Sequence, residues 1–363
     1  MSGSLRDAFA GRSVFLTGHT GFKGSWLAIW LHRLGARVVG YSLPPPTTPS
    51  NFELSGVRDL LAAHHEADIR DGDGLKKALL DADPDVVFHL AAQALVRDGY
   101  ARPRETFEVN AIGTASVLDV VRARGKPCVV LVITSDKCYA QREQAGGYRE
   151  DDPMGGHDPY SASKGAAELV TAAYRCSFFA PTRLAQHGVK LASARAGNVI
   201  GGGDWARDRI ITDVVRSLAA GQPVPVRNPL AVRPWQHVVE PLHAYLTLAA
   251  RMLHSDDPAW CEAWNFGPLP GDDVPVSKLV EQFIVVWGAG SWKDVGTPDQ
   301  PHEAPVLRLA IDKAIAQLGW RPRWALVEAI RRTAAWYRRY YEEKRANMRA
   351  ACEADIAAYE SAG

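Results

Sequence analysis

The chain has few cysteines, and their arrangement excludes two kinds of cross-linked protein. Its 363 residues include no C-x-x-C pair, and the five cysteines are scattered, at Cys128, Cys138, Cys176, Cys261 and Cys352. An odd number at such spacing predicts neither a disulfide framework nor a zinc site. We therefore expect free thiols in a reducing compartment and no metal centre.

Net charge and long apolar runs are also lacking. Lysine and arginine number 42 against 41 aspartate and glutamate, a formal charge of +1, which gives no reason to expect nucleic acid or an anionic membrane as partner. The N-terminus has no apolar core before a cleavage site, and no apolar run approaches the roughly 18 residues that span a bilayer. We expect a cytoplasmic globular protein.

What is present, up to about residue 200, is an alternation of short β-branched runs with helical stretches. The predicted strands are 13–17, 37–41, 85–90, 128–135 and 189–196, with a weaker one at 64–69; the predicted helices are 24–34, 72–82, 104–124 and 159–187. Strict alternation predicts parallel pairing. The expected fold is α/β, a doubly wound parallel sheet of the Rossmann type, with ligands at the carboxyl ends of its strands.

A glycine-rich turn follows the first predicted strand. In TGHTGFKGSWL, Gly18, Gly21 and Gly24 form G-x-x-G-x-x-G ahead of an apolar helix. Such glycines permit a tight turn, close approach of the backbone to a pyrophosphate and close helix–strand packing, while the helix N-terminus attracts the anion. The motif predicts a dinucleotide site that also includes Phe22 and Lys23.

The second predicted strand ends without an acidic residue for the adenosine ribose. It reads GYSL, and no arginine follows for a 2′-phosphate, which favours NAD over NADP. After the third strand, Asp68 is a candidate for the adenine edge beside Ile69, with helix capping as the alternative for Asp68. In HLAAQ, we expect His89 to be a core histidine, and the small residues that follow to let the cofactor pass: Leu90, Ala91 and Ala92.

Composition changes after residue 200, where glycine, proline and tryptophan become frequent. We predict an NAD-binding domain over residues 1–197 and a smaller, mainly substrate-binding lobe over 198–363, some segments of which return to the first domain. Residues 324–359 predict one long helix or two. The proline-rich segment 42–52 predicts a stiff surface loop.

A tyrosine and a lysine lie four residues apart in DPYSASKGAAELV. Asp158 can cap a helix here, which places Tyr160 and Lys164 on one face. Tyrosine titrates near ~10, so a base at neutral pH requires a shift of about 3 units, roughly 4 kcal/mol. A cation about 4 Å away supplies roughly that amount at an effective dielectric near 20. We predict that Tyr160 is a base assisted by Lys164, with an incidental Y-x-x-x-K as the alternative.

The apolar strand in LVITSDKCYA ends on three polar residues, Ser135, Asp136 and Lys137. Charged residues are almost never fully buried unless they are paired. We therefore predict that a hydroxyl, a carboxylate and an ammonium group are directed at one place, where the carboxyl end of the strand meets a ligand. The alternative is a surface ion pair worth about 0–1 kcal/mol.

Together these motifs resemble the extended short-chain dehydrogenases/reductases that act on nucleotide sugars, and the resemblance covers nearly the whole chain. It implies that Tyr160 takes the proton of the sugar 4-hydroxyl while hydride passes from carbon 4 to NAD, and that Ser135 binds the same oxygen. The strings TSDKCY, GNVIGGGDWARDRIITD and VRPWQHVVEPLHAYL are similar to the CDP-glucose 4,6-dehydratases of that family. Dehydratases for dTDP-sugars carry Asp-Glu in place of Asp136-Lys137.

The resemblance implies a lyase of deoxysugar biosynthesis with retained NAD, which converts CDP-D-glucose to CDP-4-keto-6-deoxy-D-glucose and water. Asp136 is then the acid for the 6-hydroxyl, and Lys137 either assists proton removal at carbon 5 or stabilises the enolate. The expected substrate-binding residues are Gln93, Asn198, Arg209, Arg227 and Arg233, arginine being suited to phosphate.

Three alternatives to this function stay open. The chain could be a nucleotide-sugar 4-epimerase, a 4,6-dehydratase for another nucleotide, or a non-catalytic NAD-sensing protein. We expect a homodimer or homotetramer that pairs through helices 104–124 and 159–187.

Overall fold

A seven-stranded parallel sheet forms the centre of the computed structural model, which describes residues 4–142, 146–269, 271–297, 307–343 and 347–362. Its strands are β1 (Ser13–Thr17), β2 (Arg37–Ser42), β3 (Ala63–Glu66), β4 (Val86–His89), β5 (Cys128–Ile133), β6 (Val189–Ala196) and β11 (Ala263–Phe266). Their spatial order is β11-β6-β5-β4-β1-β2-β3, so the winding reverses between β1 and β4. In open α/β sheets, ligands bind outside the carboxyl ends of strands at such a reversal.

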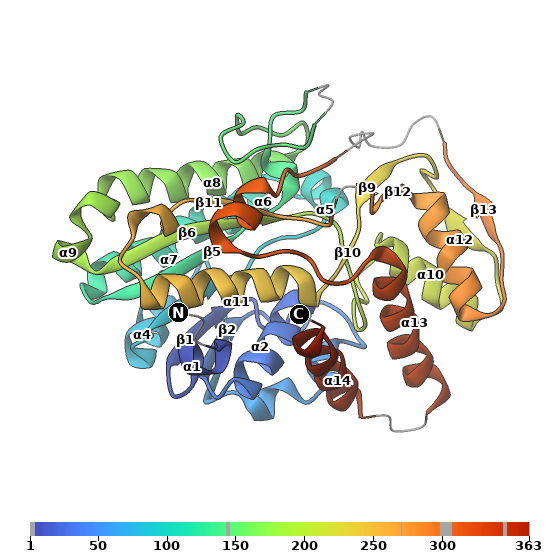
Figure 1. Ribbon diagram of the computed structural model, residues 1–363, viewed down its shortest axis with the longest axis horizontal. Coiled ribbons are helices and arrows are strands. Elements are labelled where there is room, and N and C mark those ends of the chain that lie inside the picture. The colour runs from blue at the N-terminus through green and yellow to red at the C-terminus, as the bar shows by residue number, and fades with distance from the viewer. Residues whose placement is uncertain (1–3, 143–145, 270, 298–306, 344–346, 363) are drawn as a thin grey trace.

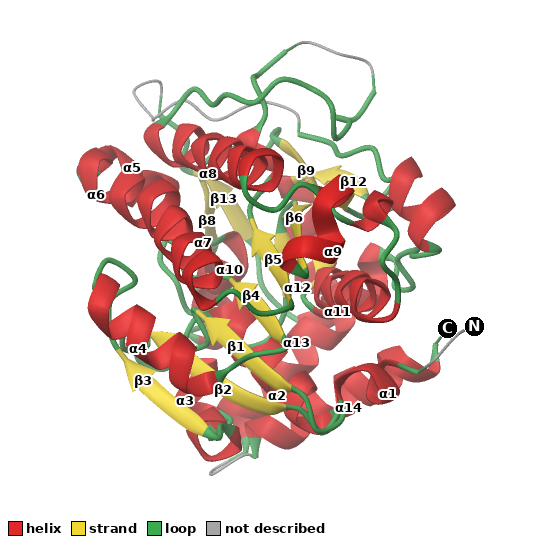
Figure 2. Cartoon of the chain, turned by 90° about the vertical axis from the view of Figure 1, so that its left-hand side faces the viewer, coloured by secondary structure: helices red, strands yellow, loops and turns green. Residues whose placement is uncertain are grey.

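Helices cover both faces of this sheet, as Figure 2 shows. One face carries α4 (Gly72–Ala82), α5 (Val96–Ala101), α6 (Pro103–Phe107), α7 (Gly113–Arg124) and α8 (Pro159–Ser177). The other carries α1 (Leu5–Phe9), α2 (Phe22–Arg33), α11 (Val239–His254) and α14 (Met348–Ser361). Alternate strand residues enter two separate apolar cores, Val14 and Leu16 in one and Phe15 in the other. The doubly wound α/β fold is confirmed.

A further group of elements lies to one side of the sheet, at the right of Figure 1. They are α10 (Ile210–Ala219), α12 (Val276–Trp287), α13 (Leu326–Glu342) and three two-stranded sheets. The sheets pair β7 (Val199–Ile200) with β10 (Gln236–His237), β9 (Val232–Pro234) with β12 (Asp273–Pro275), and β8 (Val224–Val226) with β13 (Trp292–Asp294). Between them in sequence, α11 and β11 return to the central sheet. The domain division at residue 197 stays a prediction.

Several predicted boundaries are wrong. The helix predicted over 159–187 ends at Ser177, because Pro181 forces Ala180 into an extended conformation; a turn at Pro181–Arg183 and the short α9 (Leu184–His187) follow. The helix predicted over 104–124 begins at Pro103 and contains a π-helical segment, η2 (Glu108–Ile112).

Other boundary differences are smaller. The strands predicted over 85–90 and 128–135 end at His89 and Ile133, where the backbone turns to form the candidate site. The weaker predicted strand is the edge strand β3. The C-terminal helical region consists of two helices, α13 and α14, on either side of residues 344–346, which lie outside the described residues. In segment 42–52, Ser42 belongs to β2 and a short helix, α3 (Asn51–Leu54), closes the loop.

The structure also shows how the chain stands with respect to bilayer-spanning helices and disulfide bonds. Within the described ranges, no helix is both long enough and apolar enough to cross a bilayer. All five cysteines are free thiols, and all except the exposed Cys176 are buried.

Candidate active site

The glycine turn after β1 forms a backbone cradle at the reversal of the sheet. Gly18 has a φ of +75°, and a Cβ at this position would lie 2.7 Å from the Ala91 nitrogen. A Cβ on Gly24 would lie 2.1 Å from the Gly18 carbonyl oxygen, and Gly21 is the N-cap of α2. Only glycines allow the turn, the helix and the loop after β4 to approach so closely. The resulting helix N-terminus fits the pyrophosphate of a dinucleotide.

The loop after β4 is held in place by a buried histidine. His89 Nδ1 lies 2.8 Å from Thr17 Oγ1, and its Nε2 lies 3.1 Å from Thr114 Oγ1. The Ala91 N–H donates to Thr17 Oγ1 at 3.1 Å. Burial lowers the pKa of His89 to about 3, so the ring is neutral and structural. It sets the position of Leu90, Ala91 and Ala92 beside the glycine cradle.

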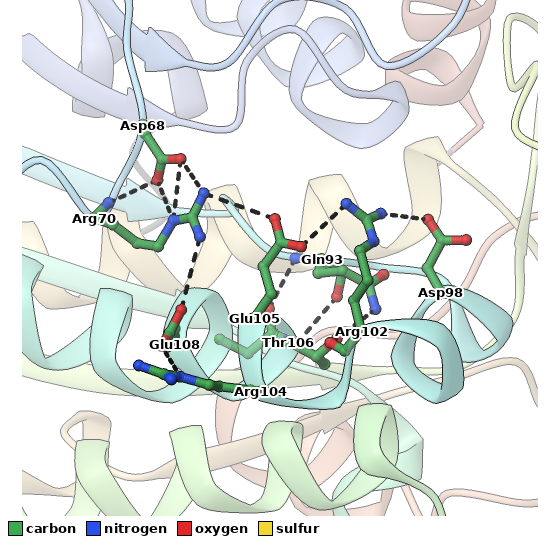
Figure 3. Close-up of polar contacts among 10 residues, drawn as sticks. Asp68, Arg70, Gln93, Asp98, Arg102, Arg104, Glu105, Thr106 and Glu108 are labelled. Atoms are coloured by element: carbon green, nitrogen blue, oxygen red, sulfur yellow. Dashed lines mark hydrogen bonds and ion pairs between the residues drawn. The ribbon is translucent and has the colours of Figure 1, made fainter.

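The carboxylate of Asp68 is bound within the chain itself (Figure 3). It accepts hydrogen bonds from the Arg70 backbone N–H at 2.8 Å and from Arg70 Nη2 at 2.6 Å, and Arg70 also forms ion pairs with Glu105 and Glu108. The hydrogen bonds from Arg70 lower the pKa of Asp68. The alternative capping role is wrong, because the N-cap of α4 is Asp71. The adenine-edge role stays a prediction.

The side chain of Gln93 is also bound within the chain. Its Nε2 donates to the Leu95 carbonyl oxygen and to Thr106 Oγ1, both at 3.0 Å, as Figure 3 shows. Its backbone N–H and carbonyl bind the side chain of Asn110, which lies in η2. These contacts fix the loop against α6, and the substrate-binding role of Gln93 stays a prediction. Ile69, which follows Asp68 in the chain, is buried.

At the carboxyl end of β5, the chain turns into a short 3₁₀ helix, η3 (Asp136–Cys138), whose N-cap is Ser135. Ser135 Oγ accepts from the Lys137 N–H at 3.2 Å and donates to Asp136 Oδ1 at 2.9 Å. Asp136 is only 2% exposed, and its Oδ2 has no hydrogen-bond partner among the described residues. Burial raises the pKa of Asp136, against the positive charges of Lys137, Arg233 and Lys23. A buried carboxylate with one free oxygen is suited to carry a proton.

Tyr160 and Lys164 lie one turn apart on the buried face of α8. Tyr160 shares a hydrogen bond with Ser135. The carboxyl end of β5 and the helix α8 therefore lie together, as predicted. Burial raises the pKa of Tyr160, while Arg209 and the Ser135 hydrogen bond lower it. Burial also lowers the pKa of Lys164 to about 8, while the Glu168 carboxylate raises it. Arg209 is therefore a cation that favours an ionised Tyr160, against the charges of Asp136 and Asp158, and the assistance of Tyr160 by Lys164 stays a prediction.

Three further cations surround this constellation. Lys23, in the first turn of α2, is partly buried, which lowers its pKa to about 8, and it acts electrostatically on Asp136 and Lys164. Arg233 on β9 is buried within range of Asp136, and Arg209 Nη2 donates to the Ala94 carbonyl oxygen at 3.3 Å. Three cations, Lys137, Arg233 and Lys23, act on Asp136, and such a cluster suits an anionic ligand.

Two predicted substrate residues have partners elsewhere in the chain. Arg227 forms ion pairs with Asp208 and, at 3.6 Å, with Asp213. Asn198 lies between β6 and β7, where its backbone carbonyl accepts from the Gln236 N–H at 3.1 Å. Substrate roles for both residues stay predictions.

Glu168, which lies on the same face of α8 as Tyr160 and Lys164, was not predicted from the sequence. It is buried and forms an ion pair of 2.8 Å with the equally buried Arg195. Burial acts to raise the pKa of Glu168, but the Arg195 charge and three hydrogen bonds hold it below its ordinary value. The spacing of four residues from Lys164 was the signal in the sequence, because it places a charge on a buried face.

Comparison with known proteins agrees with this geometry. Residues 14–261 match the model of the NAD dependent epimerase/dehydratase family. The chain is 50% identical over 334 residues to a CDP-glucose 4,6-dehydratase of Salmonella typhimurium, a match that covers 92% of each chain. It is 28% identical over 334 residues to a dTDP-glucose 4,6-dehydratase of Streptomyces antibioticus, covering 90% of this chain and 92% of the relative.

A solved structure has the same fold. The dTDP-glucose 4,6-dehydratase of Streptomyces venezuelae, solved with NAD, aligns with a TM-score of 0.76 at 23% identity, over 90% of this chain and 96% of that one. The chain belongs to the NAD dependent epimerase/dehydratase family.

Proposed function

We propose that this chain catalyses the NAD-dependent dehydration of CDP-D-glucose to CDP-4-keto-6-deoxy-D-glucose and water. The observation that carries the proposal is the buried carboxylate of Asp136, beside Ser135 and Tyr160 at the carboxyl end of β5. A 4-epimerase oxidises and reduces carbon 4 alone and needs no acid for the 6-oxygen. The 50% identity to a CDP-glucose 4,6-dehydratase supports the choice of nucleotide.

The cofactor is held by the glycine cradle and the loop after β4. Bound NAD supplies a hydride acceptor for carbon 4 and a hydride donor for carbon 6, so it ends each cycle oxidised. The residues proposed to hold it are Gly18, Gly21, Phe22, Lys23, Gly24, Asp68, Ile69, Leu90, Ala91, Ala92, Tyr160 and Lys164.

The chain's own residues move the protons. Tyr160 removes the proton of the 4-hydroxyl, and Ser135 donates a hydrogen bond to the same oxygen. The ketone at carbon 4 then acidifies the carbon-5 proton, whose removal Lys137 assists. Asp136 gives a proton from Oδ2 to the departing 6-oxygen, which leaves as water, and a proton returns to carbon 5 when carbon 6 is reduced. Burial favours the protonated Asp136 that this step requires.

The substrate diphosphate lies toward the C-terminal lobe, residues 198–363. Arg209 and Arg233 extend from this lobe to the catalytic residues, where their charges reach Tyr160 and Asp136. Arginine binds phosphate oxygens in pairs, which suits this position. The further residues proposed to bind the nucleotide sugar are Gln93, Asn198 and Arg227.

Two copies of the chain associate through the outer faces of α7 and α8. Ile112, the last residue of η2 directly before α7, and Leu169 on α8 are large apolar side chains that are each 61% exposed. A second copy covers them and forms a homodimer or a homotetramer. Sedimentation of the Ile112→Arg/Leu169→Arg double variant is expected to show monomers; an unchanged assembly contradicts this interface.

The free thiols fit a reducing compartment, so the enzyme acts in the cytoplasm. Fractionation of the source cells tests this location. Recovery of the protein outside the cytoplasmic fraction contradicts it.

Substrate assays test the function directly. The purified protein is incubated with the CDP-, dTDP-, UDP- and GDP- forms of glucose, and products are followed by the alkaline ultraviolet absorbance of 4-keto-6-deoxy sugars and by NMR. Only CDP-glucose is expected to yield the keto product, and the Tyr160→Phe variant serves as the control for catalysis. Formation of a C4 epimer without a keto product overturns the dehydratase assignment.

A further inference from the structure

We propose that Glu168 is a positioning residue, which locks the catalytic helix α8 to the end of β5 and supplies the negative charge opposite Lys164. This inference rests on the proposed function, because it concerns the same tyrosine and lysine. On this proposal, Glu168 acts together with Ser135, Tyr160 and Lys164 but does not contact the sugar.

The spacing of the helix places three functional groups on one face. Tyr160, Lys164 and Glu168 are successive residues four apart, and all three are buried. The Glu168 carboxylate accepts hydrogen bonds from Thr134 Oγ1 and, at 2.7 Å, from Ser193 Oγ. Thr134 directly precedes Ser135, so this contact sets the distance between the helix that carries Tyr160 and the strand end that carries Ser135.

The carboxylate is itself held rigidly by Arg195 on β6. Arg195 Nη2 donates to Glu168 Oε2 at 2.8 Å, and its Nη1 donates to Tyr139 Oη at 2.7 Å and to the Glu150 carbonyl oxygen at 2.9 Å. Tyr139 Oη in turn donates to Asn265 Oδ1 at 2.6 Å, on β11. Glu168 is thus connected to three strands of the sheet. Four hydrogen bonds within this buried network, from Arg195 Nη1 and Nη2 and from the Tyr139 hydroxyl, restrict the Glu168 carboxylate to one position.

The charge of Glu168 also acts on Lys164. The other groups that interact electrostatically with Lys164 are Cys138 of η3, Lys23 of α2 and His89 of β4. Burial keeps the Cys138 thiol and the His89 ring neutral, since it raises the pKa of Cys138 and lowers that of His89. Within this set, Glu168 is the single anion. It therefore favours the protonated Lys164 against burial and against the repulsion from Lys23.

A pair of variants at Thr134 separates positioning from general stability. Thr134→Val removes the hydrogen-bond donor to Glu168 while it keeps the shape and every charge, and Thr134→Ser keeps the hydroxyl. In CDP-glucose dehydration, the Val variant is expected to lose about tenfold in kcat, with KM and NAD affinity within about twofold of the wild type. The Ser variant is expected to retain wild-type kcat.

Variants at Glu168 test the electrostatic part. In Glu168→Gln, Lys164 releases its proton at lower pH, so the ionisation of Tyr160 and the acidic limb of the kcat/KM profile are expected to move to higher pH. Glu168→Asp keeps the charge and is expected to keep the profile. Because Gln leaves Arg195 without its anion, folding is checked by circular dichroism, and the Thr134 pair decides the positioning role if the Gln variant does not fold.

The outcomes distinguish this inference from the proposed function. Ultraviolet titration of the protein against its Tyr160→Phe variant measures the ionisation of Tyr160 without turnover. If the wild type does not dehydrate CDP-glucose, the proposed function fails, and the Tyr160 titration in the Glu168 variants still tests the inference. Wild-type kcat in Thr134→Val together with an unshifted Tyr160 titration in Glu168→Gln overturns it.

Discussion

The pKa values of two buried carboxylates of the site, Asp136 and Glu168, are shifted in opposite directions. Glu168 receives hydrogen bonds from Thr134, Ser193 and Arg195, so its charge is stabilised and its pKa is held low. Asp136 receives one from Ser135, its Oδ2 is without a partner among the described residues, and burial raises its pKa. The number of partners thus decides the result of burial: Glu168 is held as an anion, and Asp136 has the raised pKa that its proposed role as proton donor requires.

A variant at Lys137 tests the proposed elimination step most directly. Replacement of Lys137 by Met removes the ammonium group and keeps the apolar stem, so NAD and the sugar nucleotide are expected to bind as in the wild type. Exchange of the carbon-5 proton with deuterium from the solvent is expected to be abolished, as measured by NMR of the sugar. Unchanged turnover in this variant removes Lys137 from the mechanism.

At the scale of elements, the site depends on the close approach of α8 and η3. Gly165 follows Lys164 directly, and a Cβ at this position would lie 2.6 Å from the Gly155 carbonyl oxygen and 3.0 Å from that of Cys138. Both neighbours are backbone atoms, which cannot turn aside as a flexible side chain can. The glycine therefore allows the helix with Tyr160 and Lys164 to contact the turn with Asp136.

Gly165→Ala is expected to push α8 away from η3 and to lower kcat by at least about tenfold, because catalytic groups tolerate little misplacement. The thermal midpoint is also expected to fall, since overpacking typically costs about 1–3 kcal/mol. The matched control is Gly72→Ala, where a Cβ meets nothing within 4 Å. Wild-type kcat in Gly165→Ala contradicts the requirement for this contact.

At the scale of the whole molecule, a buried glutamate joins the C-terminal segment to the helix layer. Glu240 on α11 accepts hydrogen bonds from the backbone N–H groups of Arg323 and Trp324 and from the Tyr359 hydroxyl on α14. Burial raises the pKa of Glu240 to about 7. These contacts attach the segment before α13 and the helix α14 to α11, on the face of the sheet that carries α2 and α11.

The raised pKa of Glu240 predicts how stability changes with pH. Because the folded chain keeps this proton up to about pH 7 while the unfolded chain releases it near 4.5, stability falls as pH rises between these values. The loss is on the order of 3 kcal/mol. Glu240→Gln imitates the protonated acid, so its unfolding free energy from denaturant titration is expected to fall less between pH 5 and pH 8 than that of the wild type.

Other buried acids, such as Asp355 with a pKa raised to about 6, act in the same direction in both proteins. The difference between variant and wild type therefore isolates Glu240. Parallel stability curves across this pH range contradict the assignment.

The sequence by itself determined the sheet and the catalytic groups that follow its strands. Alternating apolar runs and helical stretches decide which face of each element is buried. The local sequence therefore predicted β1 to β6 and the position of Ser135 and Asp136 after β5. Helical spacing placed Tyr160 and Lys164 on one face of α8, and the glycine motif and Ser135 favoured a role for this pair. Prediction from the local sequence was wrong at helix ends such as Ser177 and at the π-helical segment η2. There, packing against neighbouring elements overrides the local conformational preference.

Only the tertiary structure decided which distant charges face one another. Lys23, Arg209 and Arg233 come from three separate segments, and their convergence near Asp136 and Tyr160 depends on how α10 and β9 lie relative to the central sheet. The ion pair of Glu168 with Arg195 and the engagement of Asp68 by Arg70 are likewise contacts that no local pattern encodes. Electrostatic interactions depend on distance and burial in space, and neither quantity is a property of a short stretch of chain.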